Sequence, residues 1–355
     1  MTDLLARTAE LVAIPSLSRQ EKEVADYVEA ALRRAPWLEL ARVGDNVVAR
    51  TTSGAPTRLI LAGHLDTVPA NGNAVARTVG ATLWGLGSAD MKGGVAVMVD
   101  LATTVAEPAV DVTYVFYAAE EIERRHSGLL ELAAARPELV EASAAIVCEP
   151  TGAVVEAGCQ GVLKAEVVMA GARAHVARPW KGRNAIHRLG PLLTALGDLA
   201  PRRPEIDGCR YLESVQAVKA AGGVAANVLP DTAAIELNYR FAPDRDATSA
   251  EAALREMLAP WLEDGDSLVV TDTAPAAPPS LQHPALAALV AAAGGAVAAK
   301  LGWTDVAFFA ERGVPAANFG PGDPELAHTS GEHVTRASLE RARQVLGLVL
   351  GEESS

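Results

Sequence analysis

The chain has 355 residues, of which 50% are hydrophobic and 21% are charged, and its formal net charge is −13 at pH 7. This composition is that of a globular protein, and the length suits two domains or one domain with an insertion. The acidic balance disfavours nucleic acid and anionic membranes as partners because both need a basic surface.

The amino-terminal segment lacks the features of a signal peptide. Asp3 stands where a signal peptide would be basic, and the apolar residues after it are spaced as in an amphipathic helix. The most apolar later run, 286–303, is too rich in alanine and glycine for a membrane span. Three cysteines, Cys148, Cys159 and Cys209, do not suggest a disulfide framework and fit a reducing compartment. The sequence therefore predicts a cytoplasmic protein.

The first 150 residues alternate between helix and strand patterns. Two amphipathic helices come first, at 4–11 and 21–35, and Ser18 with Glu21 resembles a capping box for the second. Apolar runs then predict strands at 46–51, 58–64, 111–119 and 144–150, with helices at 91–106 and 127–138. This alternation implies a mainly parallel sheet between helices, the arrangement of an α/β domain.

The pattern changes after residue 161. Alternating strands are predicted at 161–171, 213–223, 232–242 and 266–273, with helices at 184–200 and 249–263. Such a set predicts a four-stranded antiparallel sheet with both helices on one face. The expected layout is a discontinuous α/β catalytic domain, residues 1–161 and 273–355, interrupted by an α+β insert at 162–272.

Ionisable residues stand at the ends of three predicted strands of the first domain. His64 and Asp66 stand at the end of one strand, and Glu120 and Glu121 at the end of another. Glu149 stands at the end of a third. Ligands of parallel α/β sheets bind beyond the carboxyl ends of the strands, so these side chains are expected to meet at one rim.

Two further residues, Asp90 and His328, extend this set from glycine-rich loops. Alone, Asp90 would be a helix cap and His328 an ordinary loop residue. Carboxylates that converge on one rim, however, repel each other unless protons or cations neutralise them. Histidine and carboxylate without thiolate suit Zn²⁺, Mn²⁺ or Co²⁺. A two-metal hydrolytic site needs ligands and a base, and the sequence offers five candidate ligands with Glu120 left over: His64, Asp90, Glu121, Glu149 and His328.

The order of these motifs resembles that of a known family. The stretches GHLDTVP, GSADMKGG, EE, CEPTG and a late AH are similar to those of the dinuclear-zinc amidohydrolase/metallopeptidase family, and the resemblance covers nearly the whole chain. The family includes acetylornithine deacetylase, aminoacylase, glutamate carboxypeptidase and succinyl-diaminopimelate desuccinylase. Further stretches, such as EAGCQG and ARAHVARPWKGRNAIH, resemble the desuccinylases of actinobacterial type.

The resemblance implies a metal-binding role for each of the five ligands. Asp90 would bridge two divalent ions, which are Zn²⁺ in the family, with Co²⁺ or Mn²⁺ as alternatives. His64 and Glu149 would complete one site, and Glu121 and His328 would complete the other.

The resemblance also assigns the remaining residues of the rim. Glu120 would be the general base and acid. Asp66 would orient His64, which agrees with the H-x-D spacing because alternate residues of an extended segment point the same way. A cis peptide is expected between Asp90 and Met91.

In the family the inserted domain forms a homodimer and acts as a lid. His175 would enter the active site of the partner and stabilise the oxyanion. Asn227 and Arg240 match substrate-binding positions, and Thr304 offers a hydroxyl. Taken alone, His175 would be a loop residue and Arg240 a surface salt-bridge partner.

One stretch departs from the family pattern. Related proteobacterial enzymes carry Arg-Arg-Gly where this chain has Cys159-Gln160-Gly161, so an anion contact made there is not expected here. Arg178 or Arg173 is the candidate to replace it.

The expected reaction is hydrolysis of N-succinyl-LL-2,6-diaminopimelate to succinate and LL-diaminopimelate. Two alternatives remain open. One is acetylornithine deacetylase, or a related N-acyl-amino-acid deacylase or dipeptidase. The other is a non-catalytic metal-binding protein, against which Glu120 argues because a mere binder need not keep a base beside its ligands.

Overall fold

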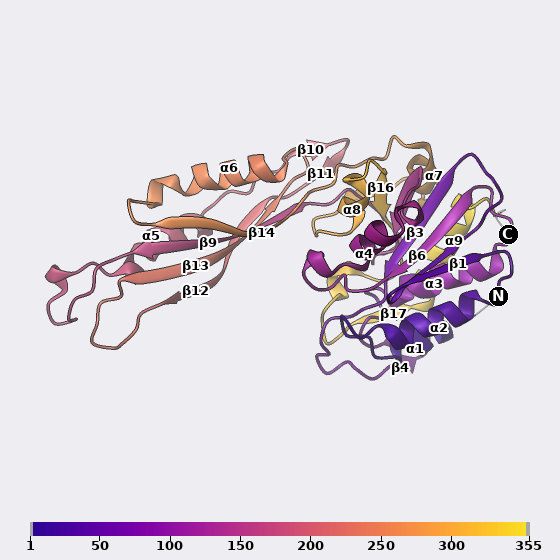
Figure 1. Cartoon of the computed structure of the whole chain (residues 1–355), viewed down its shortest axis with the longest axis horizontal. Coiled ribbons are helices and arrows are strands. Elements are labelled where there is room, and N and C mark those ends of the chain that lie inside the picture. The colour runs from indigo at the N-terminus through magenta and orange to yellow at the C-terminus, as the bar shows by residue number, and fades with distance from the viewer. Residues whose placement is uncertain (1–2, 353–355) are drawn as a thin grey trace. The chain divides into compact units, whose positions relative to one another are not determined.

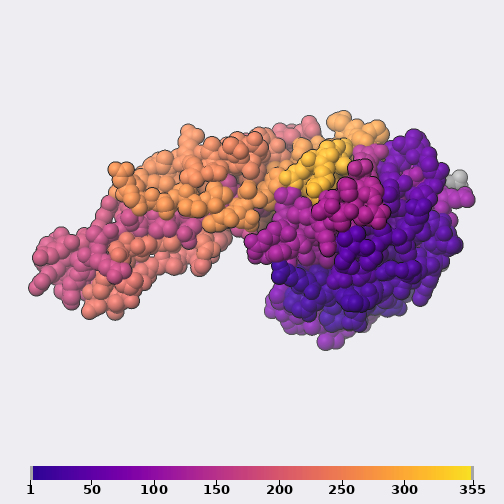
Figure 2. Space-filling view, in the orientation of Figure 1, coloured from indigo at the N-terminus to yellow at the C-terminus, as the bar shows by residue number. Residues whose placement is uncertain are grey.

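The structure is a computed structural model, and it describes residues 3–352. The chain forms two compact units (Figure 1). The first comprises the chain up to Gly158, Pro279–Ala299 and the chain from Asp305 onward, and the second comprises Cys159–Pro278 and Lys300–Thr304. Figure 2 shows one face of each unit in space-filling form. Within residues 3–352, no helix is long and apolar enough to cross a membrane.

The first unit is built on an eight-stranded sheet in the order β1-β2-β6-β3-β7-β16-β8-β15. The strands are β1 (Glu39–Val43), β2 (Asn46–Arg50), β3 (Arg58–His64), β6 (Asp111–Tyr117), β7 (Ala144–Val147), β8 (Val155–Ala157), β15 (Val297–Ala299) and β16 (Ala316–Asn318). The pairs β3–β6, β3–β7, β7–β16 and β8–β15 are parallel, and the other three pairs are antiparallel. The sheet is mixed, and the prediction of a mainly parallel sheet is confirmed.

Helices and a small second sheet complete the first unit (Figure 1). The helices are α1 (Leu4–Val12), α2 (Lys22–Leu32), α3 (Lys92–Thr104), α4 (Gly128–Ala135), α7 (Pro284–Ala293), α8 (Val306–Ala310) and α9 (Arg336–Val349). The small sheet joins β17 (His333–Thr335), β5 (Thr82–Trp84) and β4 (Arg77–Val79). Both β6, at every position, and α3, from Lys92 to Ala102, are buried. A strand or helix that is buried on all sides is mostly apolar on all sides, which explains why both appear in the sequence as largely apolar runs.

The predicted capping box of α2 is wrong. The residue at the N-cap is Glu21, and it makes no side-chain capping bond. The Ser18 hydroxyl instead donates to the Asp66 carboxylate at 2.7 Å, and the Glu21 carboxylate accepts the backbone N–H of Arg19 at 2.8 Å and of Ala119 at 3.0 Å. Contacts with distant parts of the chain have therefore replaced the local cap.

The second unit is built on a four-stranded antiparallel sheet in the order β12-β13-β9-β14. Its strands are β9 (Gly161–Ala170), β12 (Ser214–Gly222), β13 (Thr232–Phe241) and β14 (Ser267–Ala274), its helices are α5 (Ala185–Gly197) and α6 (Ala247–Leu258), and a short hairpin joins β10 (Glu205–Ile206) to β11 (Cys209–Arg210). Alternate residues of β13 are buried and share one apolar cluster with Leu192 of α5 and Leu254 of α6. The predicted α+β architecture is confirmed.

Candidate metal centre

Three neighbouring strands end at the same rim of the large sheet. Strand β3 lies between β6 and β7 and runs parallel to both. His64, the last residue of β3, is opposite Tyr117, the last residue of β6. Glu120 follows β6 by three residues, and Glu149 follows β7 by two. Parallel pairing therefore brings the predicted strand-end residues to one edge.

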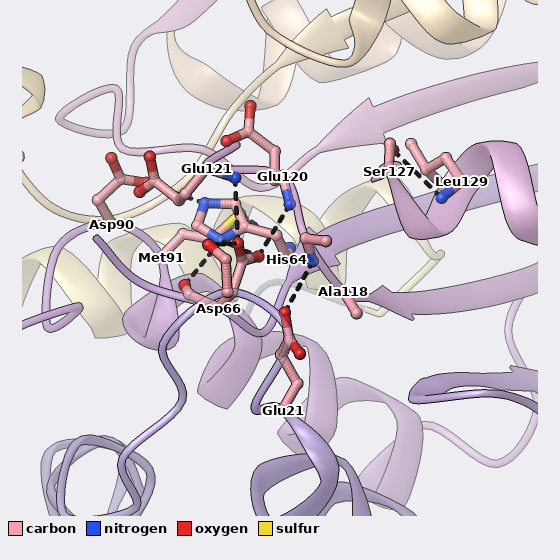
Figure 3. Close-up of polar contacts among 12 residues, drawn as sticks. Glu21, His64, Asp66, Asp90, Met91, Ala118, Glu120, Glu121, Ser127 and Leu129 are labelled. Atoms are coloured by element: carbon pink, nitrogen blue, oxygen red, sulfur yellow. Dashed lines mark hydrogen bonds and ion pairs between the residues drawn. The ribbon is translucent and has the colours of Figure 1, made fainter. Parts of the chain in front are cut away.

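Asp90 lies between two histidines. Its Oδ1 is 3.1 Å from Nε2 of His64, and its Oδ2 is 3.4 Å from Nε2 of His328. The same nitrogen of His328 is 3.0 Å from Oε1 of Glu121. Figure 3 shows the Glu121 side chain directed toward Asp90. Ligand atoms of His64, Asp90 and Glu121 all lie within 4.8 Å of one another. A carboxylate that presents one oxygen to each of two ligand groups has the arrangement that a bridging ligand needs. The Asp90–Met91 peptide is cis, as expected.

The pKa shifts in this cluster show that its carboxylates favour positive charge on the neighbouring histidines. Burial alone would lower the pKa of His64, but hydrogen bonds to Asp66 and Asp90 outweigh it and raise that pKa well above its usual value. Hydrogen bonds to Asp90 and Glu121 raise the pKa of His328 to about 10. Burial opposes ionisation of Asp90, yet the two histidines hold its pKa well below the usual range. Without metal, protons on the histidines neutralise the carboxylates. Divalent cations fit the same nitrogen and oxygen donors.

Glu120 points away from its neighbour Glu121. Figure 3 shows the two side chains leaving the backbone in different directions. Burial raises the pKa of Glu120 well above its usual value, and the charges of Glu149, Asp305 and Glu121 add to the effect, whereas His64 opposes it. A carboxyl group that readily takes up a proton beside a ligand cluster has the property required of a general base and acid.

Asp66 holds the backbone that presents both glutamates (Figure 3). Its Oδ1 accepts the N–H of Glu120, and its Oδ2 accepts the N–H of Glu121, each at 3.0 Å. It also accepts the hydroxyl of Ser18. Nδ1 of His64 is 3.0 Å from the Asp66 carbonyl oxygen but 3.5 Å from its carboxylate. In the structure, the closer partner of this ring nitrogen is therefore the backbone of Asp66 rather than the side chain suggested by the H-x-D spacing.

Sequence reasoning missed two other side chains that hold the same turn. Asn46 accepts the N–H of Ala118 at 2.9 Å, and Glu21 accepts the N–H of Ala119 at 3.0 Å. Asn46 and Glu21 are both buried. Ala119 has a φ of 57°, in the region that favours glycine. The turn that carries Glu120 is thus held by side chains from two distant segments rather than by its own conformational preference.

Two buried carboxylates flank Glu120. Glu149 is 6% exposed and Asp305, at the start of α8, is 1% exposed. Burial raises the pKa of Asp305 to about 6. Sequence reasoning missed Asp305 because it singled out the neighbouring Thr304. The only signal was an acidic residue directly before the apolar run VAFFA.

The candidates of the second unit fall into separate groups. His175, Arg178 and Asn227 are exposed and lie on paired segments, since Val176 donates its N–H to the Asn227 carbonyl at 3.2 Å and Arg178 donates to the His175 carbonyl at 2.8 Å. His175 also forms an antiparallel bridge with Val228. The structure therefore gathers these three residues on one exposed part of the unit.

Arg240 and Thr304 lie elsewhere in that unit. Arg240 is half-buried in β13, and burial lowers its pKa. No carboxylate of the described chain forms an ion pair with it, so a surface salt bridge does not explain its presence. Thr304 is 4% exposed, and its carbonyl accepts the thiol of Cys159 at 3.6 Å.

The arginines proposed to replace the missing Arg-Arg pair differ in their contacts. Arg173 is bound to Asp231 at 2.7 Å. Arg178 is exposed, and within residues 3–352 no carboxylate pairs with its guanidinium. Gln160, at the divergent position, is 1% exposed and donates to the Leu212 carbonyl. Arg178 is therefore the better placed of the two candidates to bind an anion.

Comparison with known proteins places this geometry in a family. Residues 60–352 match the model of peptidase family M20/M25/M40. A relative from Mycobacterium tuberculosis, which carries the provisional name succinyl-diaminopimelate desuccinylase DapE, is 48% identical over 98% of each chain. The succinyl-diaminopimelate desuccinylase of Corynebacterium glutamicum is 40% identical over 99% of this chain and 96% of its own.

Solved structures share the fold at low identity. A tripeptidase from Staphylococcus aureus has a TM-score of 0.80 at 19% identity, covering 98% of this chain and 97% of its own. The YXEP protein of Bacillus subtilis, described as a dinuclear metal binding peptidase, has a TM-score of 0.69 at 18% identity, covering 98% and 96%. The match to the family model and the identity to the two desuccinylase relatives show that the chain belongs to peptidase family M20/M25/M40.

Proposed function

We propose that this protein is a metal-dependent amide hydrolase that converts N-succinyl-LL-2,6-diaminopimelate to succinate and LL-diaminopimelate. The observation that carries the chemistry is the Asp90 carboxylate, whose two oxygens face His64 and His328 beside the proton-accepting Glu120. The succinyl substrate is supported by the names of two relatives that match nearly the whole chain at 48% and 40% identity.

We infer that the centre holds two divalent cations and favour Zn²⁺, with Co²⁺ or Mn²⁺ as alternatives. His64, Asp90 and Glu149 would hold one ion, and Asp90, Glu121 and His328 the other. The support is a donor set of imidazole nitrogens and carboxylate oxygens without thiolates. When bound, such ions polarise a carbonyl group and lower the pKa of water.

Glu120 and Asp66 have different roles in the proposed reaction. Glu120 takes a proton from the attacking water, whose oxygen joins the acyl carbon. As the C–N bond breaks, Glu120 returns that proton to the leaving amine. Asp66 keeps the Glu120 backbone in place throughout, because its carboxylate holds the N–H groups of both glutamates.

We infer further that the protein acts as a homodimer through the second unit. Strand β12 is at the edge of its sheet, and seven of its nine residues are exposed, Val218 at 62%. Its single charged side chain, Lys219, is paired with Glu236. An edge strand whose single charged side chain is already paired is a template for pairing with a second copy. The segment that follows β12 forms the bridge to His175, so a partner on this edge would lie near that histidine.

In this dimer His175 would stabilise the oxyanion in the active site of the partner. The substrate carboxylates would be bound by Asn227, Arg240 and Arg178, with Thr304 as a further contact. The support for Arg240 is a half-buried guanidinium whose charge no carboxylate of residues 3–352 neutralises. We assign the reaction to the cytoplasm because all three cysteines are free thiols.

Substrate preference tests the proposal directly. We expect kcat/KM with added Zn²⁺ to be higher for N-succinyl-LL-2,6-diaminopimelate than for N-acetylornithine. A higher kcat/KM for N-acetylornithine would assign the protein to the deacetylases instead. Zn²⁺ binding without turnover of either compound, or of a dipeptide, would support a non-catalytic metal-binding protein.

A further inference from the structure

A buried glutamate holds the loop that carries Asp90. Glu332 is 1% exposed and directly precedes β17. Its Oε1 accepts the N–H of Ala89 at 3.0 Å and of Asp90 at 3.1 Å, while its Oε2 accepts the N–H of Gly87 at 3.0 Å. Its carbonyl oxygen accepts the N–H of Gly85 at 3.1 Å. One residue thus satisfies four backbone donors of the short loop between β5 and α3.

This loop needs an outside partner. Gly85 and Gly87 have φ values of 154° and 76°, which belong to neither a regular helix nor a regular strand. The hydrogen bonds of the Gly87 and Ala89 N–H groups to Glu332 are buried, and a buried donor left without an acceptor costs free energy. Glu332 supplies the acceptors that a continuous helix or strand would have supplied. The position of the Asp90 backbone therefore depends on this side chain.

The same segment of chain supplies a candidate metal ligand. His328 and Glu332 are four residues apart. His328 contacts the Asp90 carboxylate, and Glu332 accepts the backbone N–H of Asp90. One contact is therefore made to the side chain of Asp90 and the other to its backbone. A shift of the 328–332 segment would therefore move one terminal ligand and the bridging carboxylate together.

We propose that Glu332 is a positioning residue that sets the Asp90 carboxylate between its two histidines and thereby controls occupancy of the metal centre. This inference rests on the proposed function for its activity readout, whereas its metal-binding readout is independent of any substrate. The Lys92 ammonium group interacts favourably with the charge of Glu332 and donates to the Ile14 carbonyl at 2.7 Å.

The decisive substitution is Glu332→Gln in the full chain. Three N–H donors converge on two carboxylate oxygens. A glutamine keeps the size but offers one oxygen, so its NH₂ group must face at least one of those donors. We expect Zn²⁺ affinity, measured by competition with a chelating dye, to fall roughly 10- to 100-fold, with a comparable fall in kcat and little change in KM, as for other residues that orient metal ligands.

A matched control separates positioning from general stability. Asp111, 4% exposed, accepts the N–H of Ser53 at 2.8 Å and of Gly54 at 3.1 Å, and it lies at the opposite end of β6 from the metal centre. We expect Asp111→Asn to lower the melting temperature but to leave Zn²⁺ affinity and kcat unchanged. If Glu332→Gln also leaves both unchanged, Glu332 serves only the fold and the proposal is wrong.

Two further outcomes also have a defined interpretation. If Glu332→Gln does not fold, Glu332→Asp provides the test, because it keeps both oxygens but withdraws them by one methylene. Wild-type Zn²⁺ affinity in that variant would overturn the proposal, and a reduced affinity would support it. If the wild-type protein binds Zn²⁺ but does not hydrolyse the succinyl substrate, the proposed function fails, while the affinity comparison still decides the role of Glu332.

Discussion

The candidate residues of the first unit and those of the second are held in different ways. Asp66 is fully buried and accepts hydrogen bonds from Ser18, Glu120 and Glu121. His175 and Asn227 are exposed and are held mainly by bonds along the backbone. Metal ligands need fixed geometry before the ion arrives, and a second layer of hydrogen bonds provides it. His175 and Asn227, the residues proposed to meet a partner and a substrate, are exposed instead.

The largest expected effect is loss of the base in the first unit. Because Glu120→Gln removes the proton acceptor and leaves the five candidate ligands intact, we expect kcat to fall about 10²- to 10⁴-fold with unchanged metal content. Steady-state kinetics and elemental analysis of the metal would measure both. The matched control is Glu123→Gln, which changes an exposed carboxylate of the same segment and is expected to be silent. Near wild-type turnover in Glu120→Gln would contradict the mechanism.

The second prediction concerns the exposed region of the second unit. His175→Ala removes the proposed oxyanion donor, and we expect kcat to fall about 10²- to 10³-fold. Metal content is expected to stay unchanged because His175 lies outside the ligand cluster. His187→Ala, which alters an exposed histidine on α5, is the matched control and is expected to retain activity.

Mixing two inactive variants sharpens this comparison. If His175 acts in the site of the partner, a heterodimer of Glu120→Gln and His175→Ala contains one intact site. Random exchange of protomers would then restore about a quarter of the wild-type activity. If His175 acts within its own chain, mixing restores nothing, and the dimeric part of the proposal is wrong.

A smaller effect is expected for the support of the rim. Asp66→Asn keeps the shape but supplies one acceptor oxygen to two N–H groups, so the Glu120–Glu121 turn should loosen. We expect kcat to fall roughly 10- to 100-fold. Ser18→Ala removes one of three donors to Asp66 and is expected to cost only about 1 kcal/mol of unfolding free energy. Equal effects of the two substitutions on kcat would show that the turn does not depend on the Asp66 carboxylate.

The sequence predicted which side chains gather at the rim better than it predicted the side chains that support them. Glu120 and Glu121 stand out because they follow β6, a strand buried throughout, and parallel strands place such residues at one edge. Hydrogen bonds from side chains to distant backbone N–H groups have no comparable pattern. Ser18 is separated by 48 residues from Asp66, and Glu332 by 242 from Asp90. For Ser18 and Glu21 a local rule even predicted the wrong role, because tertiary contacts outweighed the helix cap.

The smallest expected effect is the pH dependence of the metal-free protein. The pKa of His328 is raised from 6.5 to about 10 by Asp90 and Glu121, so its protonated form stabilises the fold. That contribution is fully present below pH 6.5 and is lost as the pH rises through about 10. The side chain is 52% exposed, so solvent screening keeps the effect small. Urea unfolding of chelated protein at pH 7 and pH 10 would measure it, with His328→Gln as the variant expected to show a smaller difference, because His64, whose pKa is also raised, remains. A metal ion needs the neutral imidazole, so Zn²⁺ uptake at pH 7 should release protons and Zn²⁺ affinity should rise with pH. Uptake without proton release would mean that His328 is not a ligand. It would also weaken the comparison between the two units, because the first unit would then hold one metal ligand fewer in place before the ion binds.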